Sequence, residues 1–358
     1  MARALEPAST VPAPRENPDL VGHEAVEGEL RRLAEAGRLP HAILFCGPRG
    51  IGKATLAFRL ARFLLAGSEA GKSGLAIDSA SGVFRRVAAG GHADLLTVER
   101  AYDPRRRRMR GEIVVEDARE ITQFFHLTAA EGGWRIVVVD GAEEMSRSAA
   151  NALLKILEEP PRHGLLLLVS HSPGLLLPTI RSRCRRFAIR ALEPAVVAQL
   201  VARYRPDLAQ AEAAALATLT EGSIGRALEL ANCDGLVLYR SMIDLISHAP
   251  RIDAVALHAF ADQFARADAE DAYRTGAELL SQFLARTAAG AARRQLVGEE
   301  PVAGECAAMQ HLAARADPAR WAALREEIEQ RFTATDNLNL DRKQAMLGAF
   351  FAIEELAR

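Results

Sequence analysis

The segment Gly47–Lys53, with the sequence GPRGIGK, constrains the fold of this chain more than any other feature. It follows a short apolar run at 42–46 and precedes a stretch with helical apolar spacing. In this strand–loop–helix context GxxxxGK predicts a phosphate loop, because glycines let backbone N–H groups curl around phosphate and the lysine adds a positive charge. Gly47, Gly50, Gly52 and Lys53 are therefore candidate nucleotide-binding residues.

Short apolar runs separated by amphipathic helical patterns continue to about residue 189. The runs are apolar on both faces, as strands inside a parallel sheet are. They are Ala42–Cys46, Leu95–Val98, Ile136–Val139, Leu165–Val169 and Phe187–Ile189. This succession predicts a doubly wound α/β domain, with helices on both faces of a parallel sheet.

After Glu193-Pro194 the strand signals end, and the remaining chain has helical patterns rich in Ala, Leu, Glu and Arg. A chain of 358 residues is long enough for several domains. The predicted division is a disordered N-terminal arm at 1–18, a nucleotide-binding-type α/β domain at 19–190, a small helical domain at 191–235 and a larger helical domain at 236–358.

Two positions that an ATPase of this type needs are altered. After Lys53 the motif should continue with Ser or Thr, whose hydroxyl binds Mg²⁺, but the residue is Ala54. Thr55 comes next, and one helical step turns its side chain by about 100° around the axis. The third apolar run ends in Asp140, a candidate metal-side carboxylate. It is followed by Gly141, where a Glu should polarise the attacking water.

Two more carboxylates follow this altered position. Glu143 and Glu144 lie beyond the expected strand end, so we expect both to face solvent and neither to replace the missing base. The intact Gly52-Lys53 pair allows ATP binding and Ala54 weakens it, so an occupied and an empty pocket both stay open.

The composition excludes several classes of protein. A formal net charge of −1 argues against binding nucleic acid over the whole surface. The 4 cysteines form no CxxC pair, which argues against a zinc site and a disulfide framework. There is no apolar run long enough to cross a membrane and no apolar signal-peptide core. We therefore expect a cytoplasmic protein without bound metal.

Two further motifs give a specific resemblance. Asn151–Pro161, with the sequence NALLKILEEPP, closely resembles the segment after the second acidic motif in bacterial clamp-loader subunits, which are AAA+ proteins. Ser182–Cys184 matches their Ser-Arg-Cys motif. Together with the phosphate loop these motifs follow the order and spacing of that family over about residues 20–235. Asn337–Asp341 also resembles part of the family's helical collar. The resemblance implies an AAA+ domain followed by a helical lid and an all-α collar.

The differences from the family's motor point to its delta-prime branch. The motor, the gamma/tau subunit, has the loop hydroxyl, the Asp-Glu pair, a cysteine zinc module and a sensor-2 arginine. Here these positions hold Ala54 and Gly141, no cysteine between 66 and 92, and Gly225, with Arg226 one step away. Delta-prime subunits tolerate such losses, although both subunit types usually keep the zinc module.

One chemical group of the family is kept. The arginine of Ser-Arg-Cys points into the neighbouring subunit's ATP site, where a guanidinium stabilises charge on the transferred phosphoryl group. The resemblance therefore implies that Arg183 is an arginine finger acting in trans. It also implies a hetero-pentamer with gamma/tau ATPase and delta subunits, which places the sliding clamp on primed DNA. This assembly is part of the DNA polymerase III holoenzyme, a DNA-directed DNA polymerase; the chain itself would need no cofactor.

Two rival interpretations stay open. The chain could be an active gamma/tau-type ATPase, against which the two altered ATPase positions argue. It could also be an independent DNA-binding AAA+ module, against which the net charge and the Ser-Arg-Cys motif argue.

Smaller features keep two interpretations each. The run Arg105–Arg110 fits a solvated loop or a phosphate contact. His23 fits a residue beside an adenine pocket or a helix-cap region. Ser170 and His171 lie either at the sensor-1 position or simply at a strand end.

Overall fold

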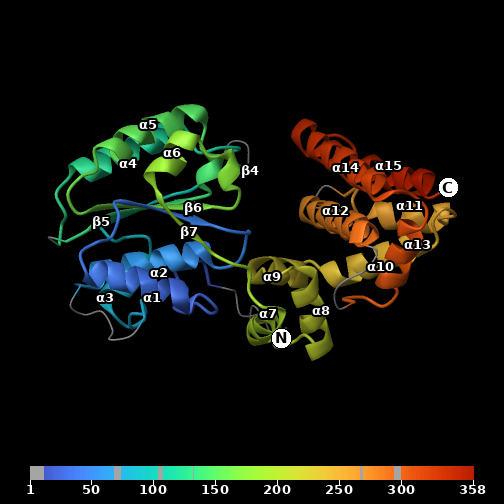
Figure 1. The fold of residues 1–358 in the computed structure, drawn as a ribbon, viewed down its shortest axis with the longest axis horizontal. Coiled ribbons are helices and arrows are strands. Elements are labelled where there is room, and N and C mark those ends of the chain that lie inside the picture. The colour runs from blue at the N-terminus through green and yellow to red at the C-terminus, as the bar shows by residue number, and fades with distance from the viewer. Residues whose placement is uncertain (1–11, 68–73, 104–107, 132, 267–268, 294–299) are drawn as a thin grey trace, which may run out of the picture. The chain divides into compact units, whose positions relative to one another are not determined.

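The computed structural model describes the chain in several stretches (Figure 1). They are residues 12–67, 74–103, 108–131, 133–266, 269–293 and 300–358. The chain forms two compact units, one of residues 1–196 with 222–225, the other of residues 197–221 with 226–358. Each unit is described by itself below. The expected boundary between a lid and a collar stays a prediction.

The first unit contains a five-stranded parallel sheet in the order β2-β5-β6-β1-β7. The strands are β1 (Ala42–Cys46), β2 (Leu95–Val98), β5 (Arg135–Asp140), β6 (Gly164–Ser170) and β7 (Arg185–Ala188). The predicted α/β class is therefore confirmed. Cys46 pairs with Ser170 and Asp140 with Val169, so the loops that follow these strands meet at one edge of the sheet.

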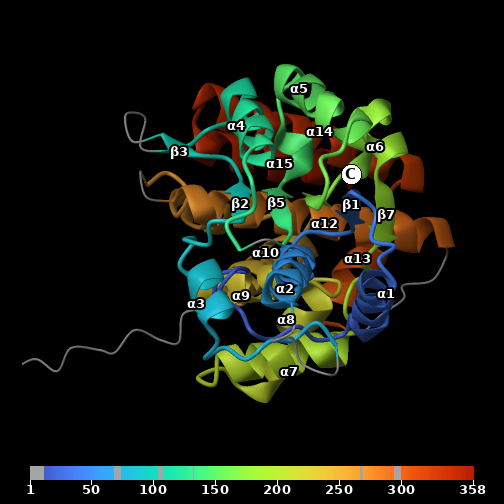
Figure 2. The ribbon, with the colours of Figure 1, turned by 90° about the vertical axis from the view of Figure 1, so that its left-hand side faces the viewer.

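Helices cover both faces of this sheet, as Figures 1 and 2 show. One face carries α1 (Glu24–Glu35), α2 (Lys53–Ala66) and α3 (Gly82–Ala88), and the other carries α4 (Val115–His126), α5 (Arg147–Glu158) and α6 (Pro178–Arg183). Successive strand residues point to opposite faces, so Ile43 and Phe45 pack under the first group while Ala42 and Leu44 pack under the second. Each buried Leu, Ile or Phe contributes about 1.5–3 kcal/mol, so the two apolar layers hold the helices against the sheet.

The edge strand differs from its prediction. We expected the last strand at Phe187–Ile189, but β7 spans Arg185–Ala188 and pairs with β1 on one side only. Arg185 and Arg186 are exposed there, since an edge strand does not need the continuous apolar sequence of an inner strand.

A small hairpin lies between β2 and α4. Its strands are β3 (Tyr102–Asp103) and β4 (Arg108–Met109), and neither was predicted from the sequence. Most of the run Arg105–Arg110 lies outside the described residues or has no described side chain.

The segment before α1 is held by two arginines of α2. Residues 1–11 of the expected arm lie outside the described residues. Arg62, 1% exposed, donates to the carbonyls of Arg15 (3.0 Å) and Asn17 (2.8 Å), and Arg59 donates to the carbonyl of Pro18. Burial lowers the pKa of Arg62 to about 10. The backbone of this segment thus satisfies a charge that would otherwise be costly to bury.

The second unit is built from helices. They are α7 (Pro194–Tyr204, which begins in the first unit), α8 (Gln210–Leu219), α9 (Ile224–Asn232, whose first residues also belong to the first unit), α10 (Gly235–Ser247), α11 (Ala254–Asp262), α12 (Glu270–Arg293), α13 (Glu305–Ala313), α14 (Pro318–Leu338) and α15 (Arg342–Leu356). The predicted all-helical C-terminal region is confirmed. Asn337–Asp341 covers the end of α14 and the turn to α15, in which Asn339 is left-handed (φ 50°) and Asp341 caps α15 through the N–H of Gln344.

A buried carboxylate stabilises the end of the sheet at which strand β2 begins. Asp94, 1% exposed, precedes β2 and accepts hydrogen bonds from the N–H groups of Ala130 (2.8 Å) and Glu131 (3.1 Å). Its Oδ1 lies 3.5 Å from Nε of Arg135, whose guanidinium stacks on Phe124 at 4.3 Å. This ion pair and its hydrogen bonds join the loop after α4 to strands β2 and β5.

We predict that Asp94→Ala lowers the free energy of unfolding by about 3 kcal/mol, because it leaves a buried guanidinium and two N–H groups without their acceptor. Urea unfolding followed by circular dichroism measures this loss. The control Glu116→Ala removes an exposed carboxylate of α4 and should change stability by less than about 0.5 kcal/mol. A loss below about 1 kcal/mol for Asp94→Ala would show that this carboxylate is dispensable.

Candidate functional site

The predicted phosphate loop lies between β1 and α2, at the side of the sheet where the carboxyl ends of the parallel strands lie. Gly50 (φ 73°) and Gly52 (φ 97°) are left-handed, a conformation that residues with a side chain rarely adopt. At Gly47 a Cβ atom would lie 2.3 Å from the carbonyl oxygen of Ile189. The glycines of the motif are therefore required by backbone geometry.

The side chain of Lys53 forms hydrogen bonds with two carbonyl groups of the phosphate loop. Its side chain is buried (3% exposed), and Nζ donates to the carbonyl of Gly47 at 2.8 Å and to that of Pro48. Burial lowers the pKa of Lys53 to about 8, although the carboxylate of Asp140 opposes this shift. Lys53 still carries its charge on most molecules at neutral pH, which suits an anion site.

Two further carbonyl groups of the loop accept hydrogen bonds from residues that lie outside the loop. The N–H of Gly225 donates to Gly50 O at 2.8 Å, and Nε2 of His23 donates to Ile51 O at 2.6 Å. In a trans peptide the N–H points away from the preceding carbonyl, so these bonds direct the following N–H groups to the other side of the loop. His23 directly precedes α1, as the helix-cap interpretation expects, and its ring also supports the loop backbone.

The contact with Gly225 leaves no space for a side chain. A Cβ atom at Gly225 would lie 2.9 Å from Cα of Gly50, so backbone packs directly on backbone. The preceding turn is fixed by Gly222 (φ 87°), whose carbonyl accepts from the N–H of Leu192 at 3.0 Å. The next residue, Arg226, forms an ion pair with Glu278 of the second unit at 2.7 Å.

The metal-binding part of the site is weak. Ala54 packs against the core under α2, and Thr55 is buried one helical step further on. Asp140 ends β5, where burial raises its pKa to about 6; Glu99 adds to this shift and Lys53 opposes it. Within the described stretches there is no group of three or more His, Cys, Asp or Glu that could hold a metal. These donors do not fit a tightly held Mg²⁺ ion.

We expected Glu143 and Glu144 to face solvent, and the structure shows that this was wrong. Both are half-buried in the short 3₁₀ helix η2 (Ala142–Glu144). Glu143 accepts hydrogen bonds from the N–H groups of His171 (2.7 Å) and Ser172 (3.2 Å) after β6; burial raises its pKa, but these and other hydrogen bonds lower it overall. Glu144 pairs with Nε of Arg100 at 2.8 Å.

Arg100 was not predicted from the sequence, although its position could have been found. Arg100 follows β2, whose Val98 pairs with Val139 of β5, so it lies beside the loop after Asp140. Because parallel strands end at a common edge, the residues just after each strand are candidates for one site.

Arg183 lies at the end of α6, on the surface of the first unit. Its side chain is 36% exposed and forms an ion pair with Glu158 at 2.8 Å and a hydrogen bond to the carbonyl of Thr179 at 3.2 Å. Cys184, the next residue, is buried under α5 and fixes the end of the helix. The two motifs that carry the family resemblance therefore meet in space at the Arg183–Glu158 pair.

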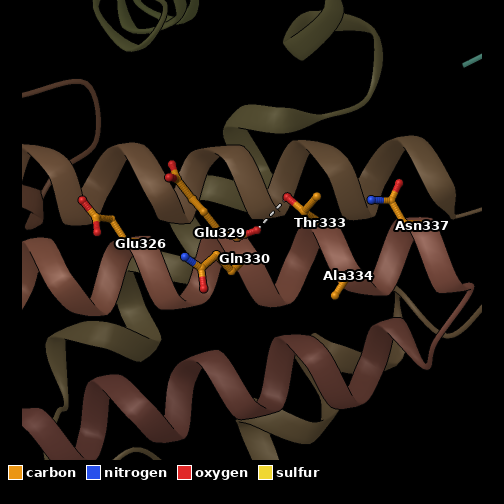
Figure 3. Close-up of a pocket in the computed structure, with 6 residues that line it drawn as sticks. All are labelled: Glu326, Glu329, Gln330, Thr333, Ala334 and Asn337. Carbon is orange, nitrogen blue, oxygen red and sulfur yellow. Dashed lines mark hydrogen bonds between the residues drawn. The ribbon is translucent and has the colours of Figure 1, made fainter. Parts of the chain in front are cut away.

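A groove in the second unit is unrelated to the phosphate loop. Figure 3 shows it along α14, lined by six residues. They are Glu326, Glu329, Gln330, Thr333, Ala334 and Asn337. Thr333 donates to the carbonyl of Glu329 at 2.8 Å, and five of the six lining residues have polar side chains. All six lie on α14, and the lining includes none of the aromatic side chains that are common in small-molecule sites.

We predict that Gly225→Ala destabilises the chain by about 2 kcal/mol, because the new methyl group forces the phosphate loop and the start of α9 apart. Thermal or urea unfolding measures this loss. The matched control is Gly28→Ala in α1, where a Cβ atom meets nothing within 4 Å. It should gain about 0.5–1 kcal/mol from helix propensity. Equal effects of the two substitutions would contradict the close contact.

A second prediction concerns pH. The pKa of Asp140 is raised to about 6 from an unfolded value of 3.8, so its charged form destabilises the fold above pH 6, and this cost disappears as the pH falls through 6 toward 4. Asp140→Asn should therefore be more stable than wild type by about 2 kcal/mol at pH 8, with no gain near pH 4. Urea unfolding across this pH range tests it. A gain that does not depend on pH would rule out the ionised carboxylate as its source.

Comparisons with known proteins agree with the motifs. Residues 22–193 match the family model described as DNA polymerase III, delta subunit. The DNA polymerase III subunit delta′ of Pseudomonas aeruginosa is 40% identical over 169 residues, which cover 47% of this chain and 48% of that protein. The subunit gamma/tau of Mycobacterium tuberculosis H37Rv is 35% identical over 187 residues, covering 52% of this chain and 30% of that protein.

Solved structures include a gamma subunit-related protein of DNA polymerase III from Thermotoga maritima, with a TM-score of 0.39 and 18% identity, covering 92% of this chain and 99% of that one. The chain spans about half or less of the length of the curated relatives named above. No helix among the described residues is long and apolar enough to cross a membrane. By the sequence matches, residues 22–193 of this chain are similar to the delta-prime and gamma/tau subunits of DNA polymerase III.

Proposed function

We propose that this chain is a clamp-loader subunit of the delta-prime type. In this role it does not hydrolyse ATP. It joins gamma/tau and delta subunits in a cytoplasmic hetero-pentamer, which loads the sliding clamp onto primed DNA for DNA polymerase III. The chain contributes Arg183 to a neighbour's ATP site, a lid at 191–235 and a collar at 236–358 for assembly.

The close contact between Gly225 and Gly50 is the main support for this proposal. The resemblance places the motor's sensor-2 arginine at position 225, and here no side chain fits between α9 and the phosphate loop. The N–H of Gly225 is also bonded to the loop at 2.8 Å. Together with Ala54 and Gly141, this removes three side chains that an ATPase of this family uses.

The surroundings of Arg183 support its role in trans. Its guanidinium lies at the protein surface, held by Glu158 and by one backbone carbonyl. An ion pair with both side chains more than a third exposed is worth about 0–1 kcal/mol, so moving Arg183 onto a phosphate of another subunit costs little. The buried Cys184 holds the helix end in place while the side chain moves.

The phosphate loop still fits a nucleotide's phosphates. Its left-handed glycines and the charge of Lys53 are the groups that bind phosphate oxygens. ATP or ADP, if bound, would be a structural ligand here. The loop hydroxyl is missing at Ala54, so the pair of hydroxyl and carboxylate that holds the metal for hydrolysis in this family is incomplete.

The alternative is an active gamma/tau-type ATPase. The relatives in Mycobacterium tuberculosis and Pseudomonas aeruginosa have similar identity to this chain, so sequence identity does not separate the two types. Turnover by the purified chain would favour the alternative.

We predict that Arg183→Ala lowers ATP hydrolysis at the neighbouring site by about 10³-fold, because a guanidinium that stabilises the transferred phosphoryl group is worth that much or more. The measurement is steady-state hydrolysis by the complex reconstituted with gamma/tau, delta, clamp and primed DNA. In that complex the other ATP sites must carry inactivating changes. The control is Arg181→Ala on the same helix, which should keep wild-type activity.

The isolated wild-type chain should show no turnover under the same conditions. Hydrolysis by the isolated chain would contradict the non-hydrolysing role. Equal activity of complexes with Arg183→Ala and Arg181→Ala would contradict the arginine finger and leave the ion pair with Glu158 as the role of Arg183.

A further inference from the structure

The position of the missing water-polarising Glu is filled by another side chain. Gly141 occupies that position in the sequence, directly after Asp140. A Cβ atom built on Gly141 would lie 2.7 Å from Oε2, 3.0 Å from Cδ and 3.4 Å from Cγ of Glu144. The carboxylate of Glu144 therefore lies where the first atoms of a side chain at 141 would be.

The backbone around Glu144 holds it in this place. The N–H of Glu144 donates to the carbonyl of Gly141 at 2.8 Å, which closes the short helix η2. The carbonyl of Glu144 accepts from the N–H of Ile113 at 2.8 Å, which ties η2 to the residues before α4. The left-handed backbone at Gly141 (φ 75°) directs the chain back over the end of β5.

The side chain is fixed and neutralised by Arg100. Nε of Arg100 lies 2.8 Å from Oε2 of Glu144, and both side chains are about one-third exposed. Arg49 of the phosphate loop also attracts this carboxylate, whereas Glu143 repels it, and burial raises the pKa of Glu144. The ion pair thus places beside Asp140 a partly desolvated carboxylate whose negative charge is balanced by Arg100.

We propose that the Arg100–Glu144 pair is a plug, which occupies the water-polarising position of this pocket and keeps it inactive. The inference rests on the proposed non-hydrolysing function and explains why restoring the lost residues would not be enough. A Glu introduced at 141 would have to displace Glu144 from Arg100. Otherwise two carboxylates would share one space, and one of them would be protonated and useless as a base. Glu144 is a positioning residue: it does not contact a substrate, and it acts by occupying the space that a side chain at position 141 would need.

The first test measures the coupling between positions 141 and 144 in the full-length chain. Gly141→Ala adds the Cβ atom, and urea unfolding gives its effect in the wild-type, Glu144→Ala, Arg100→Ala and Glu116→Ala backgrounds. The strain of a left-handed alanine is common to all four and cancels. We expect Gly141→Ala to raise the unfolding equilibrium constant about fivefold more in the wild-type than in the Glu144→Ala background. This difference is about what a partly exposed ion pair contributes to stability.

The other two backgrounds sharpen this test. Glu116→Ala, the exposed control, should leave the cost of Gly141→Ala at its wild-type value. Arg100→Ala should reduce it, because an unpaired Glu144 can swing away. Costs that agree within about 1.5-fold between the wild-type and Glu144→Ala backgrounds would overturn the proposal, since the two positions would then be independent.

The second test asks whether the plug affects chemistry. The chain with Ala54→Thr and Gly141→Glu carries two of the three lost groups, the metal-binding hydroxyl and the water-polarising carboxylate, and Glu144→Ala is then added to it. We expect this addition to raise the single-turnover rate of Mg-ATP hydrolysis by at least about tenfold while the Kd of a fluorescent ATP analogue stays within about twofold. A merely structural role would not separate rate from binding in this way. Equal rates with and without Glu144, including two undetectable ones, would overturn the proposal.

The two proposals can fail separately. Hydrolysis by the wild-type chain would remove the non-hydrolysing function, yet the unfolding measurements would still report whether Glu144 fills the space at Gly141. An absence of coupling would remove the plug and would not affect the test of Arg183 in the assembled complex.

Discussion

The backbone of the phosphate loop is held by hydrogen bonds to its carbonyl groups, and the arrangement of the site depends on this. Lys53 binds two of these carbonyls from inside, and the N–H of Gly225 and the imidazole of His23 bind Gly50 and Ile51 from outside. These donors come from three different parts of the sequence. These hydrogen bonds fix the shape of the loop, and its N–H groups are what a phosphate would meet.

Much of the α/β unit was predictable because its signals are local and strong. Ala42–Cys46 and Leu95–Val98 were predicted with their observed bounds, since both are short, mainly apolar runs, although Leu95–Val98 forms the edge strand β2. The edge strand β7 was misplaced, because exposed Arg185 and Arg186 give no such signal. The hairpin of β3 and β4 was missed, since two strands of two residues each are too short for a period to appear.

The site was predictable in its residue types and not in its contacts. The sequence shows that Ala54 and Gly141 lack the side chains of an ATPase, but it cannot show what takes their place. Glu144 returns over Gly141 only because that glycine is left-handed, and Arg100 reaches it from another strand. Such contacts join residues far apart in sequence, and they follow from how the strands are ordered in the sheet.

The two arginines that hold the segment before α1 have a consequence for how the protein is made. The carbonyls of Arg15, Asn17 and Pro18 leave the ribosome well before Arg59 and Arg62, which bind them. These carbonyls therefore cannot be bound until α2 has been synthesised. Phe84 of α3, on which the Arg62 guanidinium stacks at 4.5 Å, follows later still. During translation this segment thus stays unsecured until a later part of the same chain has been made.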